Sequence, residues 1–226
     1  MMKVSLFISL LLYSTATLTL AQECLPDDLR VDCHPDPNAT PERCLARGCI
    51  SCPASIPDRN TPTCFFPPSY GYSMVGDPIN TGHGFLINLQ RKQNQSQTLF
   101  GNDVEQLVLE VDFQSDYRLR VKITDKNRPR WEVPLVIDPS KQNLTDNPLY
   151  SVEFSKEPSF SFKIIRKSSG AVLLDTSLGG FVFSDQFIKI GFKLPSQNVY
   201  GVGENEQHSL RHSFENRPLY SLWARG

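Results

Sequence analysis

The stretch CLARGCISCP, residues 44–53, places Cys44, Cys49 and Cys52 within nine positions. Such a stretch can bind a metal, carry out redox chemistry or form structural disulfides, and the surrounding sequence decides among these. All six cysteines of the 226-residue chain lie between Cys24 and Cys64, whereas residues 65–226 contain none. We therefore expect a small cysteine-rich region followed by a larger region that is stabilised differently.

The Cys49-x-x-Cys52 pair is compatible with half of a zinc site or with a redox motif. A zinc site would use four of the six cysteines and leave two unpaired. A redox motif typically lies beside a βαβ pattern, which this sequence does not show. Disulfides that stabilise a domain too small for its own core are the better interpretation, so we expect no metal and no cofactor. Spacing alone does not select among the possible pairings.

Residues 1–21 have the composition of a secretory signal peptide. Lys3 precedes the apolar run Val4–Leu12, and small residues allow cleavage after Ala21. The run is too short and too polar for a membrane span of about 20 apolar residues, and a retained anchor is the alternative. We expect the mature chain in the secretory pathway, extracellular or lysosomal, with no membrane span after cleavage and with disulfides formed.

Three glycosylation sequons fit the same compartment and predict surface positions; they begin at Asn38, Asn94 and Asn143. The formal net charge is −1, and positive residues form no long run. Since nucleic-acid binding needs a concentrated positive face, we expect no nucleic-acid partner.

The second region shows the alternation of apolar and polar residues that is typical of strands with one buried face. This alternation occurs at Leu107–Phe113, Tyr117–Thr124, Phe160–Ile164 and Ile188–Leu194. Turn residues follow at 114–116 and at 167–170, and the second turn leads into Ala171–Leu174. No window keeps a helical period. We predict a mainly β protein whose second region is an antiparallel β-sandwich.

A segment rich in Gly, Ser, Pro and Asn separates the two regions and reads as a linker. The predicted division is a signal peptide, a cysteine-rich domain, a linker and a β-sandwich domain, at residues 1–21, 22–68, 69–84 and 85–226.

The cysteine-rich region resembles a trefoil, or P-type, domain. RVDC at 30–33, PERCLARGC at 41–49 and PTCFFPP at 62–68 occur in that family's order. The resemblance implies disulfides between the first and fifth, second and fourth, and third and sixth cysteines. In this chain these are Cys24–Cys52, Cys33–Cys49 and Cys44–Cys64.

This sequence departs from the trefoil pattern at one place. The family has adjacent fourth and fifth cysteines followed by an aromatic residue, whereas Ile50 and Ser51 separate the two here and Pro53 follows. The insertion puts the bridge to Cys24 in question. It also removes an aromatic side chain that could line a sugar-binding cleft.

The second region resembles the amino-terminal β-domain of glycoside hydrolase family 31. The segments that carry this resemblance are RPRWEVPL, PLYSVEFSKEPSFSFKIIRKSSGAVLLDTS, FSDQFIKI and LPSQNVYGVGENEQH, at 128–135, 148–177, 183–190 and 194–208. The resemblance implies a galactose mutarotase-like sandwich that, after a trefoil, precedes a catalytic barrel. It also implies an α-glucoside as the carbohydrate substrate of the full-length enzyme.

The family hydrolyses α-glucosidic bonds with retention, which requires two carboxyl groups about 5 Å apart. The family's nucleophile lies in a Trp-x-Asp-Met-Asn-Glu-like run, and this sequence contains none. A (β/α)₈ barrel takes about 250 residues, more than the whole chain. We therefore expect the chain to be the amino-terminal part of a longer enzyme. By itself it would lack the catalytic residues and the carboxy-terminal barrel, and it would be inactive.

Two short clusters near the end are candidate sites. Glu204 and Glu206 lie close to His208 and His212, and such groups can serve general acid–base chemistry, although the resemblance gives this segment a structural role. The last residues, LWARG at 222–226, resemble the family's Leu-Trp-Asn-Arg-Asp, a loop that reaches the active site.

This second resemblance makes Trp223 and Arg225 weak candidates for substrate contact. Gly226 stands where the family has the aspartate that binds sugar hydroxyls. Two alternatives to the glycosidase stay open. One is a secreted, non-catalytic trefoil protein that binds carbohydrate or mucin, and the other is an epimerase-like enzyme that uses Glu204 and His212.

Overall fold

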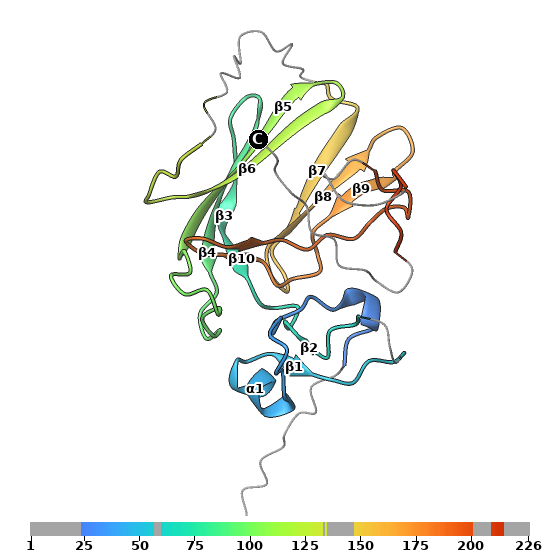
Figure 1. Ribbon diagram of the computed structural model, residues 1–226. Coiled ribbons are helices and arrows are strands. Elements are labelled where there is room, and N and C mark those ends of the chain that lie inside the picture. Colours follow the sequence, from blue (N-terminus) through green and yellow to red (C-terminus); the bar gives the residue numbers. More distant parts are fainter. Residues whose placement is uncertain (1–23, 57–59, 133, 135–146, 201–208, 215–226) are drawn as a thin grey trace, which may run out of the picture.

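The computed structural model describes residues 24–56, 60–132, 134, 147–200 and 209–214. The described part divides into a small group of elements and a larger two-sheet region (Figure 1). The predicted signal peptide lies outside the described residues. No helix in the described part of the chain is long and apolar enough to span a membrane.

The small group follows the cysteines. It contains a 3₁₀ turn, one short helix and a two-stranded antiparallel sheet: η1 Asp27–Leu29, α1 Pro41–Ala46, β1 Ile50–Ser51 and β2 Cys64–Phe65. Helix α1 begins at Pro41 because the Thr40 side chain accepts a hydrogen bond from the Arg43 backbone N–H and proline is tolerated at the first helical position. Three disulfides hold these short elements together: Cys24–Cys52, Cys33–Cys49 and Cys44–Cys64. They join the same pairs that the trefoil resemblance implies.

The larger region contains two antiparallel sheets. The four-stranded sheet has the order β3-β4-β5-β6, with bounds Tyr72–Asn80, Gly84–Arg91, Gln106–Ser115 and Arg118–Asp125. The three-stranded sheet has the order β7-β8-β9, with bounds Tyr150–Ser155, Ser161–Arg166 and Val172–Asp175. A short pair, β10 Val182–Phe183 and β11 Ile188–Lys189, follows.

The two sheets face each other across one apolar core, as Figure 1 shows. Leu107, Leu109 and Val111 of β5 are fully buried at every second position, and Phe162 of β8 and Phe183 of β10 complete the core from the other side. The apolar residues that alternate in β5 and β6 therefore lie on the face that packs against the core, since side chains at every second position of a strand point to the same face. The mainly β, antiparallel fold class is confirmed, and the described residues contain no β/α barrel.

Two element predictions need correction. Residues 69–84 are not simply a linker, because Tyr72–Asn80 forms β3. Gly76 and Pro78 suggested a loop, but β3 is an edge strand, where proline is tolerated, and its register shifts between Val75 and Ile79. The turn after β5 also lies later than expected, at Asp116 and Tyr117.

The sequence predicts a strand at Ile188–Leu194 with its apolar face inward, and this prediction is wrong. Only Ile188–Lys189 is a strand, and the apolar side chains at 188, 190, 192 and 194 are 53%, 40%, 46% and 43% exposed. On the other face Lys189 is partly buried, and its ammonium donates a hydrogen bond to the backbone oxygen of Asp32 at 2.6 Å, whereas Lys193 is exposed.

The cysteine-rich group and the sheets share a second apolar cluster, which we call the junction cluster. It consists of Cys33, Cys44, Cys49, Cys64, Phe66, Tyr70 and Val182, with Val31 and Phe187 packed against it. Val182 and Phe187 come from the β10–β11 hairpin, so the contact joins segments far apart in sequence. The Ser159 hydroxyl also donates to the Pro68 backbone oxygen, at 2.9 Å.

Asp175, at the end of β9, gives the fold a predicted dependence on acid. Burial alone would raise the pKa of its carboxyl, but the hydrogen bonds from Ser177 and the charges of Lys163 and Lys193 outweigh burial and lower it. Because the pKa of Asp175 is lower in the folded protein, its ionised carboxylate stabilises the fold at pH values above the unfolded pKa of 3.8. This stabilisation is lost as the pH falls through the pKa of the folded state.

We therefore expect Asp175→Asn to lose about 1 kcal/mol of unfolding free energy at pH 7, because both lysines are partly exposed. The difference from wild type should vanish below the folded pKa, which urea unfolding at several pH values measures. Equal losses at pH 7 and pH 2 would contradict this assignment.

Candidate functional site

The disulfide framework uses every cysteine of the chain and leaves none free. The sulfur atoms of Cys33, Cys49 and Cys64 lie within 4.8 Å of one another. A metal would need thiolates, but all three sulfurs are in disulfides. Their proximity therefore comes from two adjacent disulfides and not from a metal site.

The two inserted residues between Cys49 and Cys52 have a structural role. Ile50 and Ser51 form β1, and they pair with Phe65 and Cys64 of β2. Ile50 is 4% exposed and packs with Cys52 and Phe65. The insertion is thus accommodated as a paired strand, and the bridge to Cys24 is present beside it.

The predicted site residues fall into three groups. Asn38 and Asn94 are exposed, and the Asn94 backbone has a φ of 63°. His212 is buried, and its backbone N–H donates to the Val199 oxygen at 2.9 Å. The remaining candidates lie outside the described residues: Asn143, Glu204, Glu206, His208, Trp223, Arg225 and Gly226.

A shallow depression lies at the junction of the cysteine-rich group and the sheets. We call it the junction hollow; it encloses about 20 Å³, room for about one water molecule, and opens to solvent. Its apolar walls include Phe66 and Tyr70 after β2, and Phe100 and Phe187 from the larger region. Phe66 and Tyr70 lie 4.3 Å apart between ring centroids, and Phe100 stacks on Phe187 at 3.6 Å.

Two cationic side chains line the same hollow, Arg47 at the end of α1 and Lys189 of β11. Arg47 Nη2 lies 3.4 Å from a carboxylate oxygen of Asp36, but Nη1 is enclosed and has no hydrogen-bond partner among the described residues. Lys189 Nζ lies 5.7 Å and 6.0 Å from the ring centroids of Phe66 and Phe187. Burial lowers the pKa of Lys189, and the charge of Asp32 partly offsets this.

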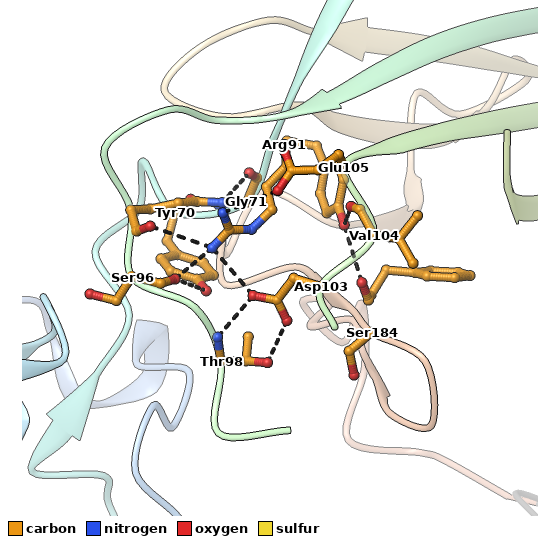
Figure 2. Close-up of polar contacts among 12 residues, drawn as sticks. Tyr70, Gly71, Arg91, Ser96, Thr98, Asp103, Val104, Glu105 and Ser184 are labelled. Carbon is orange, nitrogen blue, oxygen red and sulfur yellow. Dashed lines mark hydrogen bonds and ion pairs between the residues drawn. The ribbon is translucent and has the colours of Figure 1, made fainter. Parts of the chain in front are cut away.

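An ion-pair network holds the loop that forms one wall of the hollow (Figure 2). Arg91 Nη2 donates to the Ser96 backbone oxygen at 2.6 Å and lies 3.3 Å from a carboxylate oxygen of Asp103. Asp103 in turn accepts hydrogen bonds from the backbone N–H and the hydroxyl of Thr98. The Tyr70 hydroxyl donates to the same Ser96 oxygen, at 3.0 Å.

This network fixes the side chains at positions 97 to 100 against the junction, where they contribute to the lining of the hollow. The sequence pattern did not predict this network. A signal was present, since Arg91 occupies an inward position of β4, in phase with Ile87 and Leu89. A charged side chain at such a position needs a partner, and that partner is Asp103.

The residues that line the junction hollow include no carboxylate and no histidine. Glycoside hydrolysis needs two carboxyl groups, one on each side of the scissile bond. The lining of the hollow therefore offers no acid–base pair for hydrolysis.

Comparison with known proteins gives the following similarities. Residues 24–67 match the trefoil (P-type) domain family. The chain is 42% identical over 185 residues to lysosomal alpha-glucosidase of Mus musculus, covering 80% of this chain and 19% of the relative. It is 40% identical over 190 residues to probable maltase-glucoamylase 2 of Homo sapiens, covering 81% and 7%. It is 38% identical over 200 residues to intestinal sucrase-isomaltase of Homo sapiens, covering 87% and 11%. The chain thus spans a fifth or less of the length of these relatives.

Proposed function

We propose, from this resemblance to the amino-terminal regions of family 31 α-glucosidases, that the chain is the non-catalytic trefoil and β-domain part of such a glycosidase. In this proposal, hydrolysis of O-glycosyl bonds in α-glucosides belongs to a longer polypeptide that also carries a catalytic barrel. The described chain supports that barrel and contributes no nucleophile and no acid–base residue. No cofactor is needed for this reaction.

The observation that carries the proposal is the similarity over 80% or more of the chain to three proteins named as glycosidases. The trefoil match and the antiparallel sheets follow each other in the order that the family resemblance implies. The lining of the junction hollow, which lacks carboxylates, is consistent with a supporting role.

The size of the native protein tests the proposal. An antibody against residues 85–226 should detect, after deglycosylation, a species several times larger than 25.5 kDa in the source tissue. The purified 226-residue chain should also leave maltose intact under conditions in which a family 31 α-glucosidase hydrolyses it. A native species near 25.5 kDa, or turnover of maltose by the isolated chain, would refute the proposal.

A second candidate is a secreted trefoil protein that binds carbohydrate without hydrolysing it. The observation that favours this candidate is the match of residues 24–67 to the trefoil family. A native mass near that of the chain, together with no activity on maltose, would select it over the first proposal.

We also propose the division into a signal peptide, a trefoil domain and a β-sandwich domain, and passage through the secretory pathway to the cell exterior or the lysosome. Trp223 and Arg225 stay proposed as weak substrate contacts of the complete enzyme, and Asn143 as a glycosylation site. The exposed positions of Asn38 and Asn94 support glycans there, and Thr40 of the first sequon also caps α1.

For glycosylation we expect the chain secreted from mammalian cells to carry an N-glycan on Asn94. Asn94→Gln should therefore remove one glycan step in a denaturing gel before enzymatic deglycosylation. Ser96→Ala provides a matched variant, since only the Ser96 backbone oxygen takes part in the hydrogen bonds described above. If either variant migrates as wild type does, Asn94 is not modified.

A further inference from the structure

The segment that begins with β11 carries an apolar face, which we call the β11 face: Ile188, Ile190, Phe192 and Leu194. These side chains are 53%, 40%, 46% and 43% exposed. Apolar residues at every second position are typical of a strand that is covered on one side. A contiguous apolar patch at a protein surface marks a place of contact. The described residues cover the β11 face only in part, so it has room for a further contact.

The β11 face borders the core of the sandwich. Ile190 shares a shallow depression with Phe162 and Phe181, which belong to that core. The segment is held in place by backbone pairing, because β11 pairs with β10 and the Lys193 N–H donates to the Asp175 oxygen at 2.8 Å. A strand added over the face would therefore extend the apolar core and not an unrelated surface.

The chain turns back towards this face at its last described residues. Tyr200 and Arg211 form an antiparallel bridge, and the His212 backbone N–H donates to the Val199 oxygen at 2.9 Å. The Arg211 guanidinium also donates to the side-chain oxygen of Asn198, at 3.4 Å. Because the bridge is antiparallel, the chain at this point runs back from position 200 towards position 194.

The twelve residues that follow Phe214, ENRPLYSLWARG at 215–226, lie outside the described part of the chain. They contain an apolar group: Leu219, Tyr220, Leu222 and Trp223. Equal steps along both arms from the antiparallel bridge connect this group with the β11 face. Eight steps place Leu219 opposite Phe192. Twelve steps place Trp223 opposite Ile188.

We propose that residues 215–223 of this chain dock on the β11 face as an edge strand, with Leu219 and Trp223 packed against Phe192 and Ile188. Pro218 fits such a strand, because proline has no N–H to donate and is tolerated at the edge of a sheet. A second copy of the chain is a weaker competitor for the face, since a tethered segment is present at a high effective concentration.

The inference does not rest on the glycosidase assignment, because it concerns two segments of this chain alone. It does refine the candidate substrate contacts near the end of the chain. Trp223 becomes a positioning residue that holds the stretch leading to Arg225, and of the two only Arg225 extends beyond the docked strand.

The fluorescence of Trp223 tests the docking in the full chain. The chain has two tryptophans, and Trp131→Phe leaves Trp223 as the sole emitter; Trp131 is 81% exposed, so its replacement should leave the fold intact. The reference is the free peptide of residues 215–226. We expect Trp223 in the protein to emit at a shorter wavelength than in the peptide. Acrylamide should quench it at least about threefold less, because its ring is removed from water.

Ile188→Ser in the Trp131→Phe background should move the emission of Trp223 towards that of the peptide. It should also raise the quenching by about twofold or more, because it removes apolar area from the contact. The matched control is Ile79→Ser, since Ile79 is also 53% exposed but lies on β3, at the edge of the other sheet. This control should change neither quantity. Leu219→Ser should act as Ile188→Ser does, and it leaves every described residue unchanged.

Four results would overturn the inference. The first is emission and quenching of Trp223 equal to those of the free peptide. The second is unchanged values in Leu219→Ser or in an Ile188→Ser variant that circular dichroism shows to be folded, and the third is an equal change in Ile79→Ser. The fourth is protection of Trp223 that disappears on dilution as a dimer dissociates in analytical ultracentrifugation, which would assign the cover to a second copy. None of these results bears on the native mass or on activity towards maltose.

Discussion

Asp103→Ala is expected to lower the unfolding free energy by about 3–5 kcal/mol, because it leaves the buried Arg91 guanidinium without its buried carboxylate partner. The side chains of Asp103 and Arg91 are 3% and 10% exposed, so water cannot replace the lost carboxylate. Thr98 loses both of its hydrogen-bond acceptors in the same step. Urea unfolding followed by circular dichroism measures the loss.

The matched control is Glu105→Gln. Glu105 lies 3.7 Å from the same guanidinium, but its side chain is 60% exposed. A solvated ion pair contributes between zero and about 1 kcal/mol, so this variant should unfold nearly as wild type does. If Asp103→Ala and Glu105→Gln lose similar amounts, burial is not what makes the Arg91–Asp103 pair important.

Gly84→Ala is expected to lower the unfolding free energy by about 3 kcal/mol or more, as overpacking of a rigid site does. A Cβ atom on Gly84 would overlap the backbone oxygen of Val111 and lie 2.8 Å from its carbonyl carbon. Val111 belongs to β5, which is hydrogen-bonded to β4, so neither backbone can move without breaking the sheet. Thermal unfolding monitored by circular dichroism measures this effect.

Gly82→Ala is the control in the same turn. Gly82 also has a positive φ, of 84°, but a Cβ atom there would have nothing within 4 Å. An L-residue in this conformation costs about 1–2 kcal/mol. A loss for Gly84→Ala no greater than that for Gly82→Ala would mean that the backbone conformation, and not the clash with Val111, sets the cost.

The sequence predicted those features that depend on local pattern. The alternation at Leu107–Phe113 and Tyr117–Thr124 predicted β5 and β6 because each strand packs one face on the core. The glycine at the end of 167–170 predicted the β8–β9 hairpin, and Gly170 has the positive φ, 67°, that the turn needs. The cysteine region was predicted by its spacing and by its resemblance to trefoils.

Features that depend on distant contacts were not predicted. The alternation of Ile188–Leu194 gives a period but not whether a face is buried, and the partly buried position of Lys189 depends on its contact with Asp32, far away in sequence. The junction hollow is also assembled from distant segments, with Arg47, Phe100 and Lys189 on three different parts of the chain. No local pattern contains such a site.

The junction cluster has a consequence for how the protein opens. Its buried members include four disulfide-bonded cysteines and Val182 of β10, so the two regions share one set of apolar contacts. Two regions open separately in hydrogen exchange when few buried apolar contacts join them. Backbone amides of β2 and β10 should therefore exchange in the same subglobal event. Under thiol reductants, protection in the hairpin of β10 and β11 should fall together with that of β2, so that the redox state of the surroundings becomes a determinant of sheet dynamics.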